Sequence, residues 1–245
     1  MCPADHKPAA PGRKCEKIAT RPLKTSSPEK TSQGFSLLSL EERTLLFKEL
    51  AQKFPNPKSE LNFNSPFQLL CAVMLSAQAT DASVNLATPA LFKRAPDAKS
   101  MAVLGEEGIA PYIKSIGLWR SKARNLAQTA ALLQKDFGGQ VPRSYAELVS
   151  LPGVGSKTAL VVLNVAFHEP TVAVDTHIFR VCNRTGLCPG KNAPEVQEKL
   201  AGLIPGDYRL NAHHYLLLHG RYTCKARKPL CESCELVSLC KKRGL

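Results

Sequence analysis

The sequence of 245 residues lacks an apolar run long enough to cross a membrane. A membrane-spanning helix needs roughly 18 apolar residues, and the longest candidate stretch here, 159–167, is short and interrupted by Asn164. No secretory signal of the charged-then-apolar type follows Met1 either. These absences predict a protein without membrane spans that stays inside the cell, in the cytoplasm or nucleoid if the source is bacterial.

Sustained alternation of apolar and polar residues, the mark of a half-buried strand, is also missing. The apolar segment 171–174 is too short to seed a sheet. Capped helix starts recur instead, each followed by helical spacing, and glycines close some of the segments. We therefore predict an all-α fold of about ten or more short helices, with starts at 39–42, 65–68, 144–147 and 192–195 and ends at 138–139 and 186.

Acidic residues are scarce relative to basic ones. The chain has 33 Lys and Arg against 20 Asp and Glu, a formal net charge of +13. Such an excess indicates a polyanionic partner, either nucleic acid or an anionic membrane surface, and charge alone does not choose between them. Residues 1–35 are rich in proline, Ser and Thr and carry a net positive charge, which predicts a disordered basic tail. A mitochondrial targeting peptide is the alternative, but such peptides contain few acidic residues, and the acidic residues of this segment do not fit that pattern.

A disulfide framework is not expected, because the nine cysteines are an odd number and four of them crowd into the last 22 residues. These four have the spacing Cys224-x6-Cys231-x2-Cys234-x5-Cys240. Only one pair has the x2 spacing of a zinc ribbon, so the pattern favours a [4Fe–4S] cluster and leaves zinc open. The loop inside the first spacing is basic and could bind phosphate through Lys225, Arg227 and Lys228. Cys71 and Cys182 are expected to be small buried hydrophobes.

The segment 148–159 places Gly153 and Gly155 between two apolar helical stretches. Glycines permit positive φ and the close approach of another backbone, and Ser156 is expected to cap the helix that follows. The first N–H groups of that helix would then suit a phosphate. This is the pattern of a helix-hairpin-helix element, which holds a DNA strand through its backbone; a tight corner between two helices is the plainer interpretation.

Lys157 falls in the first turn of the second helix, where the helix dipole disfavours an ammonium ion. A neutral lysine amine can form a Schiff base with an aldehyde; taken alone, Lys157 is more simply a solvated charge or a phosphate contact, and the hairpin context favours the nucleophile. Asp175 follows the apolar strip 171–174 and is expected first as a helix N-cap. The same carboxylate could also stabilise positive charge that develops on a sugar. The histidines at 213, 214 and 219 have no Cys or Glu at ligand spacing, so we expect them to serve in packing.

Together these segments resemble the endonuclease III family of DNA base-excision glycosylases. The resemblance covers about residue 37 to the C-terminus and rests on the four-cysteine spacing and four motifs: LSAQATD (75–81), LPGVGSKTA (151–159), AVDTHIFRV (173–181) and HGRYTC (219–224). It implies a six-helix barrel domain at 59–169 that includes the hairpin. A discontinuous cluster domain would combine 36–58 with 170–245, and a cleft would lie between the two.

The resemblance also implies an activity. A bifunctional DNA glycosylase and AP lyase would act as a monomer on double-stranded DNA that carries oxidised pyrimidines, such as thymine glycol, or abasic sites. The family's catalytic lysine and aspartate match Lys157 and Asp175, and its cluster ligands match the four C-terminal cysteines. Gln78, Leu118 and His177 match residues that fill or probe the hole left by a flipped nucleotide.

Two rivals remain. One is a monofunctional relative that removes adenine, which resembles this chain in hairpin and cluster. Such relatives lack the lysine, carry a glutamate at the position of Ala72 and add a C-terminal domain. The other rival is a non-enzymatic DNA-binding iron–sulfur protein.

Overall fold

The computed structural model describes residues 37–245 and contains only helices and connecting loops in this range. The predicted tail, 1–35, lies outside the described residues. The all-α prediction is confirmed. The helices are α1 (Leu40–Lys53), α2 (Pro66–Ser76), α3 (Asp81–Arg94), α4 (Ala98–Ile113), α5 (Trp119–Asp136), α6 (Tyr145–Ser150), α7 (Ser156–Phe167), α8 (Thr176–Thr185), α9 (Ala193–Leu203), the 3₁₀ helix η1 (Gly206–Tyr208) and α10 (Ala212–Tyr222).

Most of the predicted helix boundaries are confirmed by the caps that the structure contains. Ser39 caps α1 in a reciprocal capping box with Glu42, and Ser65 and Asn192 cap α2 and α9 through their side chains. Ser144 precedes α6 as predicted, although its side chain makes no capping hydrogen bond. At the other end, Gly186 terminates α8 with a φ of 83°, a conformation that glycine adopts without steric cost.

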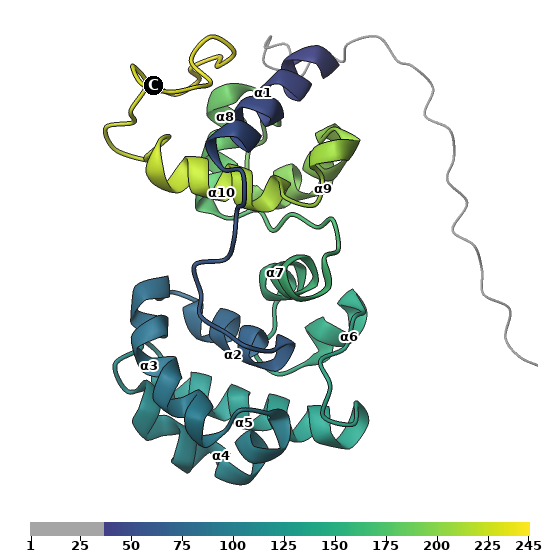
Figure 1. Cartoon of the computed structure of the whole chain (residues 1–245), viewed down its shortest axis with the longest axis vertical. Helices are drawn as coiled ribbons and strands as arrows, with labels where there is room; N and C mark the ends of the chain where they lie inside the picture. Colours follow the sequence, from purple (N-terminus) through teal and green to yellow (C-terminus); the bar gives the residue numbers. More distant parts are fainter. Residues whose placement is uncertain (1–36) are drawn as a thin grey trace, which may run out of the picture.

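The buried apolar side chains form two separate cores. One core is built within 61–163, from α2 to α7, and the other combines 38–50 with 172–236. Figure 1 shows the corresponding arrangement, with α2 to α6 at one end of the molecule, α1, α8, α9 and α10 at the other, and α7 between them. The predicted division into a barrel domain and a discontinuous cluster domain is consistent with these cores and stays a prediction.

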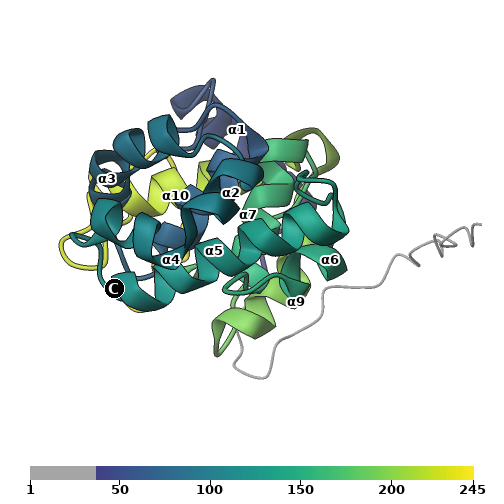
Figure 2. The same ribbon diagram turned by 90° about the horizontal axis from the view of Figure 1, so that it is seen from below.

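Packing within the larger core is dominated by α4 and α5, which run side by side in the view from below (Figure 2). α2 contacts α3, α5 and α7. It is apolar on every face, and nine of its eleven residues are buried; a helix that is hydrophobic all round belongs in the centre of a core. Cys71 on α2 is buried, as is Cys182 on α8, which confirms both expectations. No described helix combines the length and apolarity that crossing a membrane requires.

Candidate active site and metal centre

Lys157 and Asp175 meet between the two cores. Lys157 Nζ lies 3.7 Å from Asp175 Oδ2, although 17 residues of α7 and its following loop separate the two positions. The lysine side chain is 61% exposed and the carboxylate only 11%. The pair therefore presents an accessible amine beside a sheltered carboxylate.

The two helix starts hold the pair in place. Asp175 is the N-cap of α8, and its Oδ1 accepts hydrogen bonds of 2.9 Å from the backbone N–H groups of His177 and Ile178. This leaves Oδ2 to face Lys157, which is the second residue of α7. The cap that was expected of Asp175 and the ion pair are thus made by different oxygens of one carboxylate.

The hairpin before α7 differs from the prediction in one respect. Ser156 does not cap α7; it is the first residue of the helix, and Gly155 is the N-cap, which makes no side-chain hydrogen bond. Gly155 has a φ of −91°, so only Gly153, at 75°, uses the positive φ that glycine permits. A helix start without a side-chain cap leaves its first N–H groups free for an anion.

Helix α5 packs closely against the hairpin. The Thr129 hydroxyl on α5 donates a hydrogen bond of 2.8 Å to the Pro152 carbonyl. A Cβ atom at Gly153 would lie 2.5 Å from Asn125 Nδ2, whereas a Cβ at Gly155 would meet nothing within 4 Å. Gly153 is therefore required by packing, and Gly155 opens toward free space where a strand could approach.

A cavity of about 430 Å³ joins the hairpin to the ion pair. Its walls come from α2, α7, α10 and the segment before α2, so both cores contribute. An adjoining hollow shares several of these residues and adds the start of α8. Of the residues predicted from the sequence, the cavity is lined by Gln78, Gly153, Gly155, Lys157 and Asp175, and the hollow by Gln78, Lys157, Asp175 and His177.

Sequence reasoning missed a charged group in the same cavity. Arg221 at the end of α10 donates to Asp81 Oδ2 at 2.8 Å and also pairs with Glu60. Tyr222 donates to the same glutamate. The motif 219–224 contained Arg221 and Tyr222, but nothing in the sequence indicated that the chain returns to residues 60 and 81.

His213 also lines this cavity and is almost fully buried. Burial, together with the neighbouring His214, lowers the pKa of His213 to about 3 despite the opposing charge of Asp175. The ring is therefore neutral at physiological pH. Its Nδ1 accepts from the Ala173 backbone N–H at 3.4 Å, just before the segment that carries Asp175.

Gln78 and Leu118 occupy two neighbouring loops, one after α2 and one before α5. Both residues have left-handed backbone conformations, with φ of 55° and 59°, and the Leu118 side chain is 61% exposed. Leu118 is not among the residues that line the cavity. His177, in contrast, lies at the start of α8 with its Nδ1 3.2 Å from Arg180 Nη2.

The four C-terminal cysteines surround a second, small cavity beyond α10. Its remaining walls include the apolar side chains of Leu230, Leu236 and Val237. Burial raises the pKa of Cys234 and Cys240, and the charges of neighbouring cysteines add to this effect. Four sulfur donors gathered around one small cavity are the donor set of a metal site, because a bound metal offsets the repulsion between thiolates. The residues therefore fit a metal centre.

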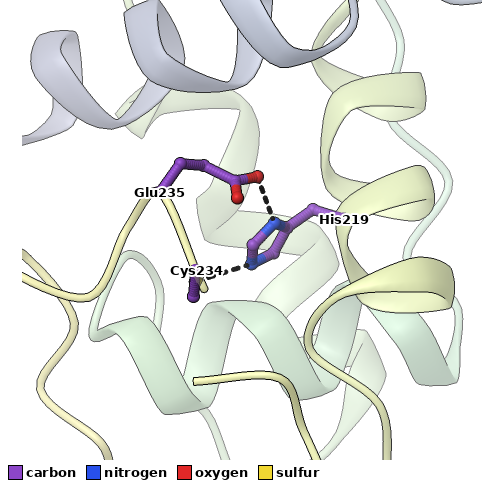
Figure 3. A group of neighbouring side chains, drawn as sticks. All are labelled: His219, Cys234 and Glu235. Atoms are coloured by element: carbon purple, nitrogen blue, oxygen red, sulfur yellow. Dashed lines mark hydrogen bonds and ion pairs between the residues drawn. The ribbon is translucent and has the colours of Figure 1, made fainter. Parts of the chain in front are cut away.

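His219 approaches this site, contrary to the expectation that the histidines serve only in packing (Figure 3). Its Nε2 lies 3.9 Å from Cys234 Sγ and its Nδ1 lies 3.1 Å from Glu235 Oε1. Burial opposes ionisation of Glu235, but hydrogen bonds from His219 and the backbone lower its pKa to about 2. These three side chains could themselves hold a metal ion. This contact could not be predicted from sequence spacing, because Cys234 and Glu235 lie 15 and 16 residues after His219.

Hydrogen bonds from Arg184 hold the start of the basic loop 225–230 in place. Arg184 on α8 donates to the carbonyls of Lys225 at 2.7 Å and Ala226 at 3.1 Å. Lys225, Arg227 and Lys228 are all exposed. They line neither the cavity of Lys157 nor the adjoining hollow, so any contact that they make with a ligand is separate from that site.

Comparison with known proteins places these features in a family. The model of the HhH-GPD superfamily of base excision DNA repair proteins matches residues 71–206. Endonuclease III of Escherichia coli K12 is 54% identical over 199 residues, which cover 81% of this chain and 94% of that protein. Endonuclease III of Haemophilus influenzae is 51% identical over 199 residues, which again cover 81% of this chain and 94% of that protein.

The fold is also similar to a solved structure. A trapped covalent intermediate of endonuclease III with DNA, the estranged-adenine complex, has a TM-score of 0.78 and 42% sequence identity. The match covers 84% of this chain and 97% of that one. Each of these matches covers more than half of the chain. The chain therefore belongs to the HhH-GPD superfamily of base excision DNA repair proteins, within its endonuclease III family.

Proposed function

We propose that Lys157 and Asp175 perform the chemistry of this enzyme, a DNA glycosylase and AP lyase that removes oxidised pyrimidines in base excision repair. The observation that carries the proposal is the contact of 3.7 Å between an exposed amine and a sheltered carboxylate, beside a cavity that reaches the hairpin. A similar fold has been solved as a trapped covalent intermediate with DNA, and a covalent intermediate requires a nucleophile on the protein.

The proposed reaction begins with a nucleotide flipped out of the duplex into the cavity, because C1′ cannot be reached inside the stack. Asp175 takes a proton from the Lys157 ammonium, and the free amine attacks C1′. The bond from C1′ to the base breaks, and the base leaves with the bonding electrons and takes up the proton that Asp175 holds, so that Asp175 is a carboxylate again. The sugar ring then opens to give a Schiff base between Lys157 and C1′. Asp175 stabilises the positive charge that develops on the sugar as the base departs.

The lyase step follows from the Schiff base. The positively charged imine acidifies the proton on C2′, and its loss to a base releases the 3′ phosphate with the electrons of the C3′–O bond. This β-elimination cuts the strand 3′ to the lesion. Water then hydrolyses the remaining Schiff base and returns Lys157 as a free amine.

DNA would be held by groups around this centre. The uncapped start of α7, at Gly153, Gly155 and Ser156, offers backbone N–H groups to a phosphate. The exposed Lys225, Arg227 and Lys228 would contact the backbone further along, with the salt dependence of phosphate contacts. Gln78, Leu118 and His177 would fill the space that the flipped nucleotide leaves, since an amide, an apolar wedge and an imidazole suit that task.

The proposed cofactor is a [4Fe–4S] cluster held by Cys224, Cys231, Cys234 and Cys240. When bound, it joins the loops at 224–240 into one rigid unit and supplies redox capacity. No step of base removal passes through it. We further take the protein to act as a monomer on double-stranded DNA inside the cell, with lobes at 59–169 and at 36–58 plus 170–245.

The test is a duplex that carries one thymine glycol, incubated with cluster-loaded protein. The proposal predicts release of the base together with strand cleavage 3′ to the lesion. Base release without cleavage would make the protein monofunctional. Tight binding with neither reaction would make it a non-enzymatic DNA-binding protein, and either result would overturn the proposal.

A further inference from the structure

We propose that Lys122 is a positioning residue for DNA binding, which locks the loops of Gln78 and Leu118 together. The inference rests on the proposed function, in which these two residues enter the space left by the flipped nucleotide.

The first loop is a tight turn at the end of α2. Ala77 has φ and ψ of −57° and 115°, Gln78 has a φ of 55°, and the Ala79 N–H donates to the Ser76 carbonyl at 3.0 Å. These values describe a type II turn, whose third position favours glycine or asparagine. Glutamine at that position is strained, and strain of this kind persists only where the surroundings enforce it.

The second loop precedes α5 and has the same property. Leu118 has φ and ψ of 59° and 28°, and its apolar side chain is mostly exposed. Its carbonyl accepts from the Lys122 N–H at 3.1 Å and from the Ser121 hydroxyl at 2.9 Å. A Cβ on the preceding Gly117 would lie 3.9 Å from the Gln78 carbonyl, so the two strained loops lie side by side.

Lys122 connects them. Among residues 37–245 it is the only buried lysine, with 7% of its surface exposed, and burial lowers its pKa. Its Nζ donates a hydrogen bond of 2.9 Å to the Leu75 carbonyl in the last turn of α2. Carbonyls at a helix C-terminus lack partners within the helix and attract cations. One side chain therefore ties the first turn of α5, next to Leu118, to the last turn of α2, next to Gln78.

This connection has a consequence for DNA binding. Two residues can fill one gap in a duplex only if their loops keep a fixed spacing. The ammonium of Lys122 fixes that spacing from inside the protein without touching DNA. A lysine that served only the packing of α2 against α5 would support every activity of the protein to the same extent, and this difference can be measured.

The test compares Lys122→Met with Lys135→Met, an exposed lysine at the far end of the same helix. We expect Lys122→Met to slow base release from a thymine glycol duplex by about ten- to 100-fold, the size of effect that a small misplacement produces. Borohydride trapping on an abasic site should fall by less than about threefold, because no base has to be unstacked there. Lys135→Met should change neither.

A double-mutant cycle with Leu118→Ala separates positioning from general packing. If Lys122 acts through Leu118, the loss caused by Leu118→Ala should be much smaller in the Lys122→Met background than in the wild type. Equal losses in both backgrounds, or equal loss of base release and abasic-site trapping, would overturn the inference. If Lys122→Met loses its helical circular dichroism, the same cycle is run with Lys122→Gln, which keeps a donor.

Emission from 2-aminopurine opposite the lesion gives a readout that does not require catalysis. The wild type should raise it on binding, and Lys122→Met should not. Failure of the wild type to trap an abasic site would contradict the proposed function while this signal still tests Lys122. An unchanged signal in Lys122→Met would contradict the inference while wild-type trapping still supports the function.

Discussion

At the scale of single residues, Asp175 performs two tasks with two oxygens. Oδ1 caps α8 and Oδ2 faces Lys157. Asparagine is as good an N-cap as aspartate but carries no charge, so the two tasks can be separated by substitution.

We predict that Asp175→Asn leaves the free energy of unfolding within about 1 kcal/mol of the wild type. It should slow base release by at least about 100-fold, since charge stabilisation is lost. Asp175→Ala should add a further loss of about 1 kcal/mol in stability. Chemical denaturation and single-turnover kinetics measure the two effects. Normal base release by Asp175→Asn would show that the carboxylate is only a cap.

A second prediction at this scale concerns His213 and the pH dependence of stability. The unfolded histidine binds a proton below about pH 6.5, whereas the folded one does so only near pH 3. Acid therefore favours the unfolded state between these values, and stability rises with pH in this window. Between pH 7 and pH 5, His213 should lower the free energy of unfolding by about 2 kcal/mol. Burial also lowers the pKa of His214, so this residue should lower the stability in the same direction. Denaturation of His213→Gln should show a visibly smaller loss; a loss equal to the wild type's would refute the assignment.

At the scale of elements, the helix boundaries and the hairpin turn are determined by local sequence. The glycines, the caps at Ser39, Ser65 and Asn192, and the helix end at Gly186 could all be predicted because each depends on residues within one turn. The expected cap at Ser156 was wrong for a local reason as well: the helix begins one residue earlier than assumed, at Ser156 itself, and Gly155 takes the N-cap position.

The two glycines should respond differently to the same substitution. Gly153→Ala forces a residue with a side chain to a φ of 75° and against Asn125, so we expect a loss of about 1–3 kcal/mol in stability. Gly155→Ala meets open space and should change stability by less than about 1 kcal/mol. It should nevertheless weaken binding to duplex DNA, because its Cβ occupies the approach to the free N–H groups. Thermal denaturation and a binding titration at fixed salt separate the two variants. Equal stability losses would contradict this account.

At the scale of the whole molecule, the site is built from both cores. Lys157 and Asp81 lie on helices of the larger core, whereas Asp175 caps α8 and Arg221 ends α10 in the smaller one, so the ion pairs Lys157–Asp175 and Arg221–Asp81 both join the two parts. Lys157 and Asp175 could be identified from the sequence motifs that contain them, and their roles could be predicted from the resemblance to the family. Contacts such as those of Arg221 with Glu60, or of His219 with Glu235, could not be predicted, because they depend on how distant segments pack rather than on local spacing.

The central claim is that the Lys157 amine forms the covalent bond with DNA. It is tested most directly by borohydride trapping on duplexes that carry thymine glycol or an abasic site, followed by mass spectrometry of the linked peptide. The account predicts an adduct from both duplexes at Lys157, none with Lys157→Ala, and normal trapping with the exposed-lysine control Lys135→Ala. An adduct at another residue, or one that persists in Lys157→Ala, would contradict it.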